Sequence, residues 1–526
     1  MQNALREFVL DDYQGSAGDH GLPLPGSRFS WADGDRPRAL RRVWLDTFDW
    51  RLYRSGLTLE QVASRGRTQL SLTGRDGEVI AAQQISPRSG AAGGPVKWPS
   101  LIEALPVGPL REYLLPVVGV RALLPVARAV SRVHDQRVVN SDDKTVARVS
   151  VDRMSVTFPA TAAAPPRLSV RALRGYQAQA DRVVDILAAL PGVADGTQSP
   201  LEAALAAAGR RPADYSGKIS VRLAPGMPAV TAMAMVLTAL LDTLEANVTG
   251  TVRDVDTEFL HDLRIAVRRT RSALRLTGSV LPAGLASRFR PDFKWLGDLT
   301  TPTRDLDVYL LGFSGMAAGL VAGTVQELQP FRDHLGRRRA AAQRELARGL
   351  RSARFSRLIG EWRECLSAAA AGGRRRPTAA QLAASRIARA HRRVITDGSA
   401  ITATSPPDSL HELRKRCKEL RYLLEIFGSL HDPAEQWQAV RELKNLQDCL
   451  GEFQDTEVQR REIRAFAAQM MDERSAPAAT LLAMGEIAAG LAVRQRRARG
   501  EFSDRFGAFA SAASQARFDA LSRAAG

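Results

Sequence analysis

The chain is 526 residues long and 45% apolar, more than one hydrophobic core usually serves, so two or three globular domains are expected. Its 74 Lys and Arg residues outnumber 56 Asp and Glu residues, which gives a formal net charge of +18. This balance predicts a polyanionic partner, but it does not choose among nucleic acid, anionic lipid and other polyanions. The three cysteines are widely spaced, which argues against a disulfide framework or a cysteine zinc site and favours a reducing compartment.

The sequence pattern predicts neither a signal peptide nor a membrane span. The N-terminal stretch MQNALREFVLDDYQ lacks the basic start and the apolar run of a signal peptide. The longest apolar run, near AVTAMAMVLTALL, is predicted to be too short to span a bilayer. We therefore expect a soluble cytoplasmic protein without a membrane partner.

Residues 1 to about 160 have the pattern of an α+β fold. The stretches QLSLTG and EVIAAQQI flank a turn at Arg75-Asp76-Gly77, which predicts two strands joined by that turn. VARVSVDRMSV, residues 146–156, alternates with period two and predicts another strand. A helical insertion is expected near residues 100–133.

Glycine and proline mark the division of the chain. The segment from Pro191 to Pro228 surrounds one short alanine-rich helix and is the best candidate for an interdomain connection. Beyond Pro228 the pattern is helical almost to the end. The predicted division is an N-terminal domain at 1–200, a connecting segment at 201–227 and a helical domain at 228–515.

The helical half contains an internal repeat with an offset of 150 residues. HDLRIAVRRTRSALR, from His261, matches HELRKRCKELRYLLE, from His411. In the same register, FKWLGDLTTPTRDLDV, from Phe293, matches LKNLQDCLGEFQDTEV, from Leu443. Two similar modules are therefore predicted, at about 228–370 and 382–515, joined by the loop-like AGGRRRPTAAQ.

Each copy of the repeated helix carries a basic stripe beside an apolar stripe. At 100° per residue, spacings of three and four place side chains on one helix face. The basic stripe contains His261, Arg264, Arg268, Arg271 and Arg275 in the first copy, and His411, Arg414, Lys418 and Arg421 in the second. The apolar stripe contains Leu263, Val267, Thr270 and Leu274 in the first copy, and Leu413, Cys417, Leu420 and Leu424 in the second.

A solvated helix face with i,i+4 charge pairs is the plainer interpretation of such a stripe. In HDLRIAVRRTRSALR, however, Asp262 is the only acid, so local pairing cannot neutralise five arginines. Arginine suits phosphate because its planar fork donates two parallel charge-assisted hydrogen bonds and keeps its proton. The histidine at the head of each stripe can also donate to a phosphate oxygen. The repeat therefore predicts an anion-binding surface.

Other charged positions are weaker candidates. Four arginines of a later predicted helix share one face: Arg337, Arg344, Arg348 and Arg351. The shifted copy of that helix keeps only Arg494. Asp305 and Asp455 are expected to cap a helix or to pair with arginines, and metal binding is the less favoured alternative.

Together HDLRIAVRRTRSALRL, LGDLTTPTRDLDV, HELRKRCKELRYLLE and LKNLQDCLGEFQDTEV resemble the CHAD domain, named for its conserved histidines and α-helices, over roughly residues 228–515. The resemblance implies an all-α fold of two pseudo-symmetric four-helix bundles, whose basic inner surfaces bind inorganic polyphosphate, and an association with polyphosphate granules. The binding residues it implies are His261, Arg264, Arg268, Arg271, Lys294, His411, Arg414, Lys418, Arg421 and Lys444. Glu419 and Glu425 replace Arg269 and Arg275, so these two arginines are weaker candidates and the second copy departs from the pattern there.

The N-terminal half resembles a CYTH domain, a triphosphate tunnel fold, through WLDTFDWRLYRSGLTL, residues 44–59. An active tunnel of this kind needs an ExExK motif, in which acids hold a metal ion and a lysine holds phosphate. This chain has LREFV there, with only Glu7 in place. The resemblance therefore implies a degenerate antiparallel CYTH-like barrel, without catalytic residues, a metal site or a cofactor.

We accordingly expect a non-enzymatic protein that binds polyphosphate. The alternatives are a metal-dependent triphosphatase of the CYTH type, non-specific nucleic-acid binding, and a scaffold for an acidic protein partner. The missing carboxylates argue against the enzyme. Single-strand binders usually add aromatic platforms for bases, and Tyr422 is the one aromatic residue interleaved with the arginine rows, which argues against nucleic acid.

Overall fold

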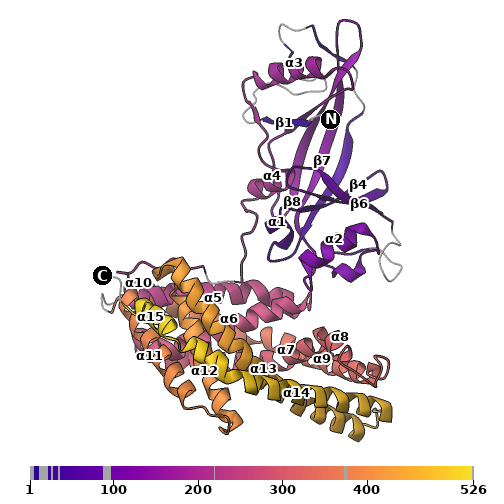
Figure 1. Cartoon of the computed structure of the whole chain (residues 1–526). Coiled ribbons are helices and arrows are strands. Elements are labelled where there is room, and N and C mark those ends of the chain that lie inside the picture. Colours follow the sequence, from indigo (N-terminus) through magenta and orange to yellow (C-terminus); the bar gives the residue numbers. More distant parts are fainter. Residues whose placement is uncertain are drawn as a thin grey trace. The chain divides into compact units, whose positions relative to one another are not determined.

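The computed structural model describes residues 5–10, 22–24, 28–32, 36–86, 96–217, 220–371 and 377–523. The chain divides into two compact units, Met1–Ser216 and Gly217–Gly526 (Figure 1). The short alanine-rich helix expected between the domains is α4, Pro200–Ala207, and its buried leucines pack in a core cluster of the N-terminal unit. Of the predicted loop AGGRRRPTAAQ, residues 372–376 lie outside the described residues.

The N-terminal unit is built on one antiparallel sheet (Figure 1). Its main path runs β11-β1-β10-β8-β7-β3-β4-β5-β6, while β2 pairs with β7 and β9 pairs with β8. The strands are β1 Leu5–Leu10, β2 Ser30–Ala32, β3 Arg38–Asp46, β4 Thr58–Ser64, β5 Arg67–Thr73, β6 Val79–Ile85, β7 Leu124–Val139, β8 Thr145–Phe158, β9 Ala162–Ala163, β10 Arg167–Ala172 and β11 Val193–Asp195. The described strands leave this path open between β11 and β6, so a closed CYTH-like barrel is not confirmed.

The described part of this unit also contains the α-helices α1 Arg51–Arg54, α2 Pro109–Val118 and α3 Gln177–Ala188 and the short 3-10 helix η1 Ile102–Ala104. The predicted strands are confirmed, since β5 and β6 flank the Arg75-Asp76-Gly77 turn and β8 contains residues 146–156. The helical insertion expected near residues 100–133 is correct only for η1 and α2. Beyond Leu124 the chain is strand β7, because side chains at every second position, from Ala127 to Val133, are buried in the period of a strand.

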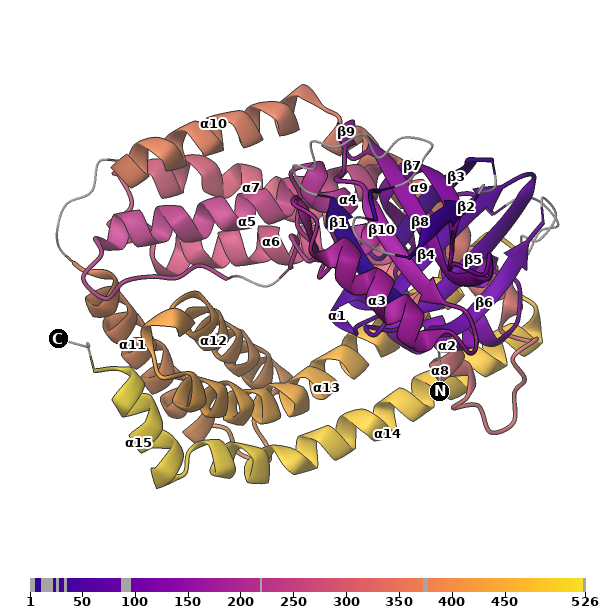
Figure 2. The same cartoon turned by 90° about the horizontal axis from the view of Figure 1, so that it is seen from above.

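The helical unit repeats itself along the chain (Figure 2). The first copy contains α5 Ala229–Val252, α6 Thr257–Leu276, η2 Gly278–Val280, α7 Leu285–Leu311, α8 Phe313–Ala317, α9 Gln329–Leu350 and α10 Ala353–Ala371. The second contains α11 Ala379–Ser399, α12 Pro407–Ile426, η3 Gly428–Leu430, α13 Pro433–Asp472, α14 Ala478–Phe509 and α15 Ala512–Leu521. Both ends of α12 and η3 lie 150 residues after those of α6 and η2, which confirms the predicted repeat.

The buried side chains of the two copies form one large core cluster. In the first copy, Phe289 and Phe293 of α7 pack on the buried Trp362 of α10, with ring centroids 4.7 Å and 5.5 Å away. A smaller cluster forms where α7, α8 and α9 meet α13 and α14. Because the large cluster joins both copies, two separate four-helix bundles are not confirmed.

Helix α5 contains the longest apolar run. It has 24 residues, and an 18-residue window within it has a mean hydropathy of 1.5, so by length and composition it could cross a membrane, and the expectation that the run is too short is wrong. In the structure, 56% of its apolar window is buried. Leu237 and Leu244 belong to the core cluster shared by the two copies, which is the position of a core helix.

Candidate anion-binding site

Helix α6 separates its two predicted stripes between core and surface. Asp256 caps its N-terminus, where the carboxylate accepts hydrogen bonds from the backbone N–H groups of Glu258 and Phe259. The apolar stripe is buried, with Leu263, Val267, Thr270 and Leu274 at most 2% exposed. Arg268, Arg271 and Arg275 are exposed beside it. The burial of one stripe therefore fixes the direction in which the arginines point.

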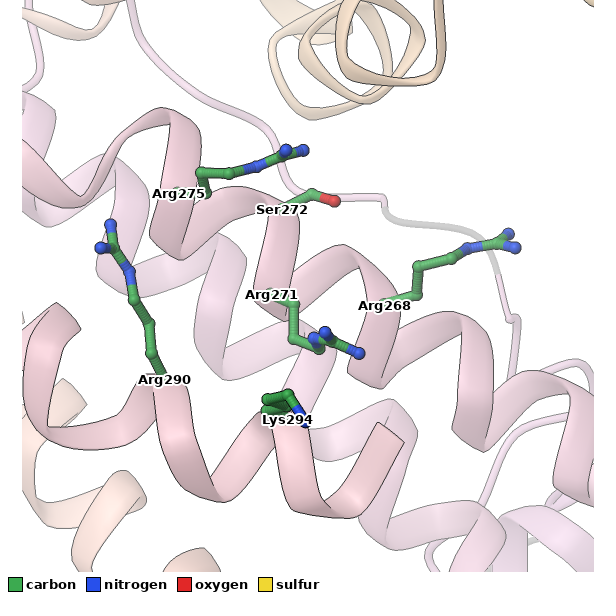
Figure 3. A pocket seen from close by; sticks show the side chains of 6 residues that line it. All are labelled: Arg268, Arg271, Ser272, Arg275, Arg290 and Lys294. Carbon is green, nitrogen blue, oxygen red and sulfur yellow. The ribbon is translucent and has the colours of Figure 1, made fainter. Parts of the chain in front are cut away.

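Five cations line a pocket of about 520 Å³ between α6 and α7, the α6–α7 pocket (Figure 3). Its lining consists of Arg268, Arg271, Ser272, Arg275, Arg290 and Lys294. Among the residues that the structure describes, no carboxylate lines it. Like charges gathered in one concave site raise its positive potential, so the lining favours an anionic ligand.

Arg271 lies close to α7 at Gly297. A Cβ at that position would be 2.5 Å from Arg271 Nη1, so the glycine leaves room for the guanidinium group. In the second copy the equivalent residue is Gln447, whose Oε1 accepts a hydrogen bond of 3.3 Å from Arg421 Nη1. The first copy therefore lacks the side-chain acceptor that the second copy offers to this arginine.

A second pocket, of about 420 Å³, lies where α6 meets α12 and α13, and we call it the α6–α12 pocket. Its lining contains the cations Arg268, Arg269, Arg414, Lys418 and Arg421, and the acids Glu425, Asp448, Glu452 and Asp455. Because Arg268 lines both pockets, the two predicted stripes meet at one site.

The second copy neutralises its own cations to a greater extent. Arg414 Nη2 lies 2.9 Å from Asp455 Oδ1, and Arg421 Nε lies 2.8 Å from Glu425 Oε1. The expected pairing of Asp455 with an arginine is thus confirmed. Two lysines carry the same exposed i,i+4 pair in both copies, Lys294 with Asp298 at 2.7 Å and Lys444 with Asp448 at 2.9 Å.

The histidines at the heads of the stripes are half-buried. His411 Nδ1 is 2.8 Å from Gln454 Oε1, which fixes the ring in the second copy. Burial and the nearby Arg304 lower the pKa of His261, which disfavours the charged form of this imidazole. Neither histidine is among the residues that line the two pockets.

Burial also affects the cations near the junction of the copies. It lowers the pKa of Lys418 to about 8, and the neighbouring charges of Arg414 and Arg268 act in the same direction. Burial likewise lowers the pKa of Arg264, against the attraction of Asp305. Arg264 Nη1 donates to Thr301 Oγ1 at 2.6 Å and to the carbonyl oxygen of Gly297 at 3.2 Å. Arg264 therefore lies among α7 acceptors, while Arg268 and Arg271 face the α6–α7 pocket.

The two positions at which the second copy departs from the first form ion pairs between the copies. Arg269 Nη2 of α6 is 2.8 Å from Glu425 Oε2 of α12, and Arg275 Nη1 is 2.8 Å from Glu419 Oε1. At the 150-residue offset, position 269 corresponds to 419 and position 275 to 425. Each ion pair therefore joins an arginine of the first copy to the residue that occupies, in the second copy, the position equivalent to the other arginine. Because both positions hold arginine in the first copy and glutamate in the second, both contacts have opposite charges.

Some predicted residues lie away from the pockets, and others that line them were missed. Arg337 and Arg344 are exposed on α9, Arg348 there pairs with Glu345, and none of the three lines either pocket. Arg494 lies 2.7 Å from Glu452 Oε1 on α13. Sequence reasoning missed Arg290, which has no cationic counterpart because Val440 occupies the equivalent position.

In the N-terminal unit, arginines pair with several carboxylates on the sheet. Glu7 Oε2 is 2.6 Å from Arg167 Nη2, and Arg42 pairs with both Glu60 and Asp152. Among the described residues there is no group of three or more His, Cys, Asp or Glu side chains that could hold a metal ion. Glu7, Glu60 and Asp152 are thus held in internal ion pairs, while Asp46 at the end of β3 is buried and accepts hydrogen bonds from the backbone N–H groups of Thr47, Leu52 and Tyr53.

The helical unit is a duplicated all-α domain with an arginine-lined pocket on the repeated helix. Residues 235–464 match the family model of the CHAD domain. This match identifies a CHAD domain at residues 235–464, within the wider range 228–515 over which the resemblance was expected. The CYTH-like assignment of the N-terminal unit stays a prediction.

Three known proteins resemble parts of the chain. The uncharacterized protein Rv2226 of Mycobacterium tuberculosis is 29% identical over 225 residues, which cover 41% of this chain and 42% of that relative's length. The structure of the CHAD domain from the plant Ricinus communis has a TM-score of 0.48 at 23% identity and covers 55% of this chain and 95% of its own. PptA from Streptomyces chartreusis has a TM-score of 0.42 at 17% identity, covering 53% of this chain and 99% of its own.

Proposed function

We propose that the helical unit binds inorganic polyphosphate without catalysing a reaction on it. The observation that carries this proposal is the α6–α7 pocket, whose lining has five cations and, among the described residues, no carboxylate. Arginine donates charge-assisted hydrogen bonds to phosphate oxygens, and four of the five cations are arginines. A chain of phosphates can occupy the α6–α7 pocket and continue past Arg268 into the α6–α12 pocket.

A nucleic acid is the less favoured partner. Single-strand binders stack bases on exposed aromatic rings. Tyr422 lines the α6–α12 pocket, and its ring centroid lies 5.9 Å from the guanidinium carbon of Arg268. Tyr422 is only 8% exposed, so its ring is not available as a stacking platform. A ligand made of phosphates without bases fits these residues better.

We further propose a degenerate CYTH-like fold for the N-terminal unit and two pseudo-symmetric four-helix bundles for the helical unit. The alternative function, a metal-dependent triphosphatase, needs carboxylates that are free to hold a metal ion. Glu7, the one residue of the expected motif in place, is paired with Arg167. Phosphate release from tripolyphosphate with Mg²⁺ or Mn²⁺, lost on Glu7→Ala, would establish the enzyme instead.

A cytoplasmic location at polyphosphate granules is part of the same proposal. The direct test is calorimetric titration of the full chain with long-chain polyphosphate at several salt concentrations. Neutralising five phosphates predicts a slope of log affinity against log salt of roughly −3 to −4, if the single-strand value applies. Affinity that does not change with salt would contradict phosphate contacts by these cations.

Binding is expected to take up a proton at Lys418 near pH 8. The pKa of this ammonium group is about 8 in the free protein, and a bound phosphate favours the charged form and raises the pKa. Affinity should therefore be highest below pH 8 and fall as pH rises through that value. Calorimetry near pH 8 in two buffers with different protonation enthalpies measures the uptake. Lys418→Arg keeps the positive charge and should abolish it, and an equal uptake in this variant would assign the proton elsewhere.

A further inference from the structure

Arginines continue beyond the α6–α7 pocket onto α11. Arg386, Arg389 and Arg393 follow spacings of three and four, so they share one helix face. Ile387 and Val394, on the neighbouring face, are fully buried and anchor α11 in the core. The equivalent positions of the first copy are Val236, Ala239 and Thr243, which shows that this arginine row belongs to the second copy alone.

Two further pockets connect this face of α11 to the α6–α7 pocket. In Figure 3, Arg275 and Arg290 stand toward one end of that pocket and Arg268 toward the other. Arg275, Arg290 and Arg386 line the next pocket, of about 470 Å³. The one after it, of about 280 Å³, is lined by the arginines Arg275, Arg386, Arg389, Arg393 and Arg416. Because neighbouring pockets share arginines, the three pockets form one continuous path. We call the arginines along it the arginine series: Arg268, Arg271, Arg275, Arg290, Arg386, Arg389 and Arg393.

The acid in the pocket lined by Arg389 and Arg393 does not neutralise the positive charge of these two arginines. Among the described residues that line it, Glu419 is the one carboxylate, and it is 4% exposed. Its Oε1 already accepts from Arg275 at 2.8 Å and from Arg416 at 3.4 Å. Arg389 and Arg393 also line this pocket, and both are exposed. Their charges therefore remain for a ligand.

We infer that the arginine series is an extended subsite, along which a long phosphate chain leaves the α6–α7 pocket and crosses the junction of the two copies to α11. This inference rests on the proposed function. The step from Arg386 to Arg393 adds about 10 Å of helix to the path, which a short phosphate ligand held in the first pocket does not reach. Contacts made by one chain in adjacent pockets are intramolecular after the first, so affinity rises with chain length.

The test compares Arg389→Ala/Arg393→Ala with a matched control, Arg357→Ala/Arg392→Ala, in the full chain. Both control arginines are exposed. Neither lines the α6–α7 pocket, the two pockets that connect it to α11, or the α6–α12 pocket. Calorimetry with long-chain polyphosphate should show that the affinity of the α11 variant is roughly tenfold lower than that of the wild type. The slope of log affinity against log salt should be shallower by about 1 to 2. Tripolyphosphate binding should stay at the wild-type value, while the control should match the wild type with both ligands.

Each outcome separates the two claims. Suppose that the wild type binds both ligands and that the α11 variant and the control have the same affinity for long-chain polyphosphate. The inference is then overturned and the proposed function stands. An equal loss with tripolyphosphate and long chain also overturns it, because α11 would then belong to the first pocket. If the wild type binds neither ligand, the proposed function fails and the inference fails with it.

Discussion

Replacing Arg268, Arg271 and Lys294 together by alanine is expected to weaken polyphosphate binding on the order of 100-fold, or about 3 kcal/mol. These three side chains line the α6–α7 pocket and are exposed, so their loss removes ligand contacts and little packing. A hydrogen bond to a charged group contributes about 1.5 to 3 kcal/mol at most, and solvent exposure reduces that figure. The measurement is the dissociation constant for long-chain polyphosphate at one fixed salt concentration.

The matched control replaces three exposed arginines outside the pockets, Arg357, Arg392 and Arg496, and so removes the same net charge. It should weaken binding only slightly, through the lower overall charge of the chain. A second-copy variant of the α6–α12 pocket, Arg414→Ala/Lys418→Ala/Arg421→Ala, should lose less than the first-copy variant, because acids in its pocket already pair with two of its cations. Equal losses in the first-copy variant and the control would show that the pocket is only a solvated face.

Removing the two carboxylates that join the copies is expected to have the largest effect on stability. Glu419→Gln/Glu425→Gln leaves Arg269 and Arg275 without their partners, and the side chains of Arg269 and Glu419 are only 16% and 6% exposed. An uncompensated buried charge costs about 3 to 5 kcal/mol, and that is the upper bound for the loss in free energy of unfolding here, because the side chain of Arg275 is 55% exposed and only Arg269 is largely buried. Denaturant unfolding of the full chain, followed by helical circular dichroism, measures the shift.

The same substitutions should change binding in the opposite direction. Loss of Glu425 removes an acid from the α6–α12 pocket, so polyphosphate should bind this variant more tightly and stabilise it more than the wild type. The control, Glu345→Gln/Glu361→Gln, removes two carboxylates from exposed ion pairs, which are worth less than about 1 kcal/mol each. If the double variant is no less stable than this control, the ion pairs do not hold the copies together.

The repeat and its stripes could be predicted because they are local. Spacings of three and four fix which side chains share a helix face, and a constant offset between two segments implies the same fold twice. The structure agrees at Leu263 and Leu413, which are fully buried, and at Arg268 and Arg271, which are exposed. The alternation of Val146 to Val156 similarly identified β8.

The remaining features depend on contacts between distant segments, which periodicity does not give. Glu419 and Glu425 were seen as departures from the repeat, and only the packing of α12 on α6 reveals them as partners of arginines. The α11 arginines follow the same spacing as those of α6, so they could have been noticed. Their relation to Arg275, however, requires the second copy to be placed against the first. The open sheet likewise depends on which strands pair at its ends.

The most direct measurement is a side-by-side calorimetric titration of the full chain with long-chain polyphosphate and with single-stranded DNA or RNA of matched charge, at one fixed salt concentration. Polyphosphate is expected to bind more tightly, because the pocket offers arginines for phosphate and no exposed aromatic residue among those that line it. Equal or weaker affinity for polyphosphate would contradict the account, since the site would then recognise charge without distinguishing a phosphate chain from a nucleic acid.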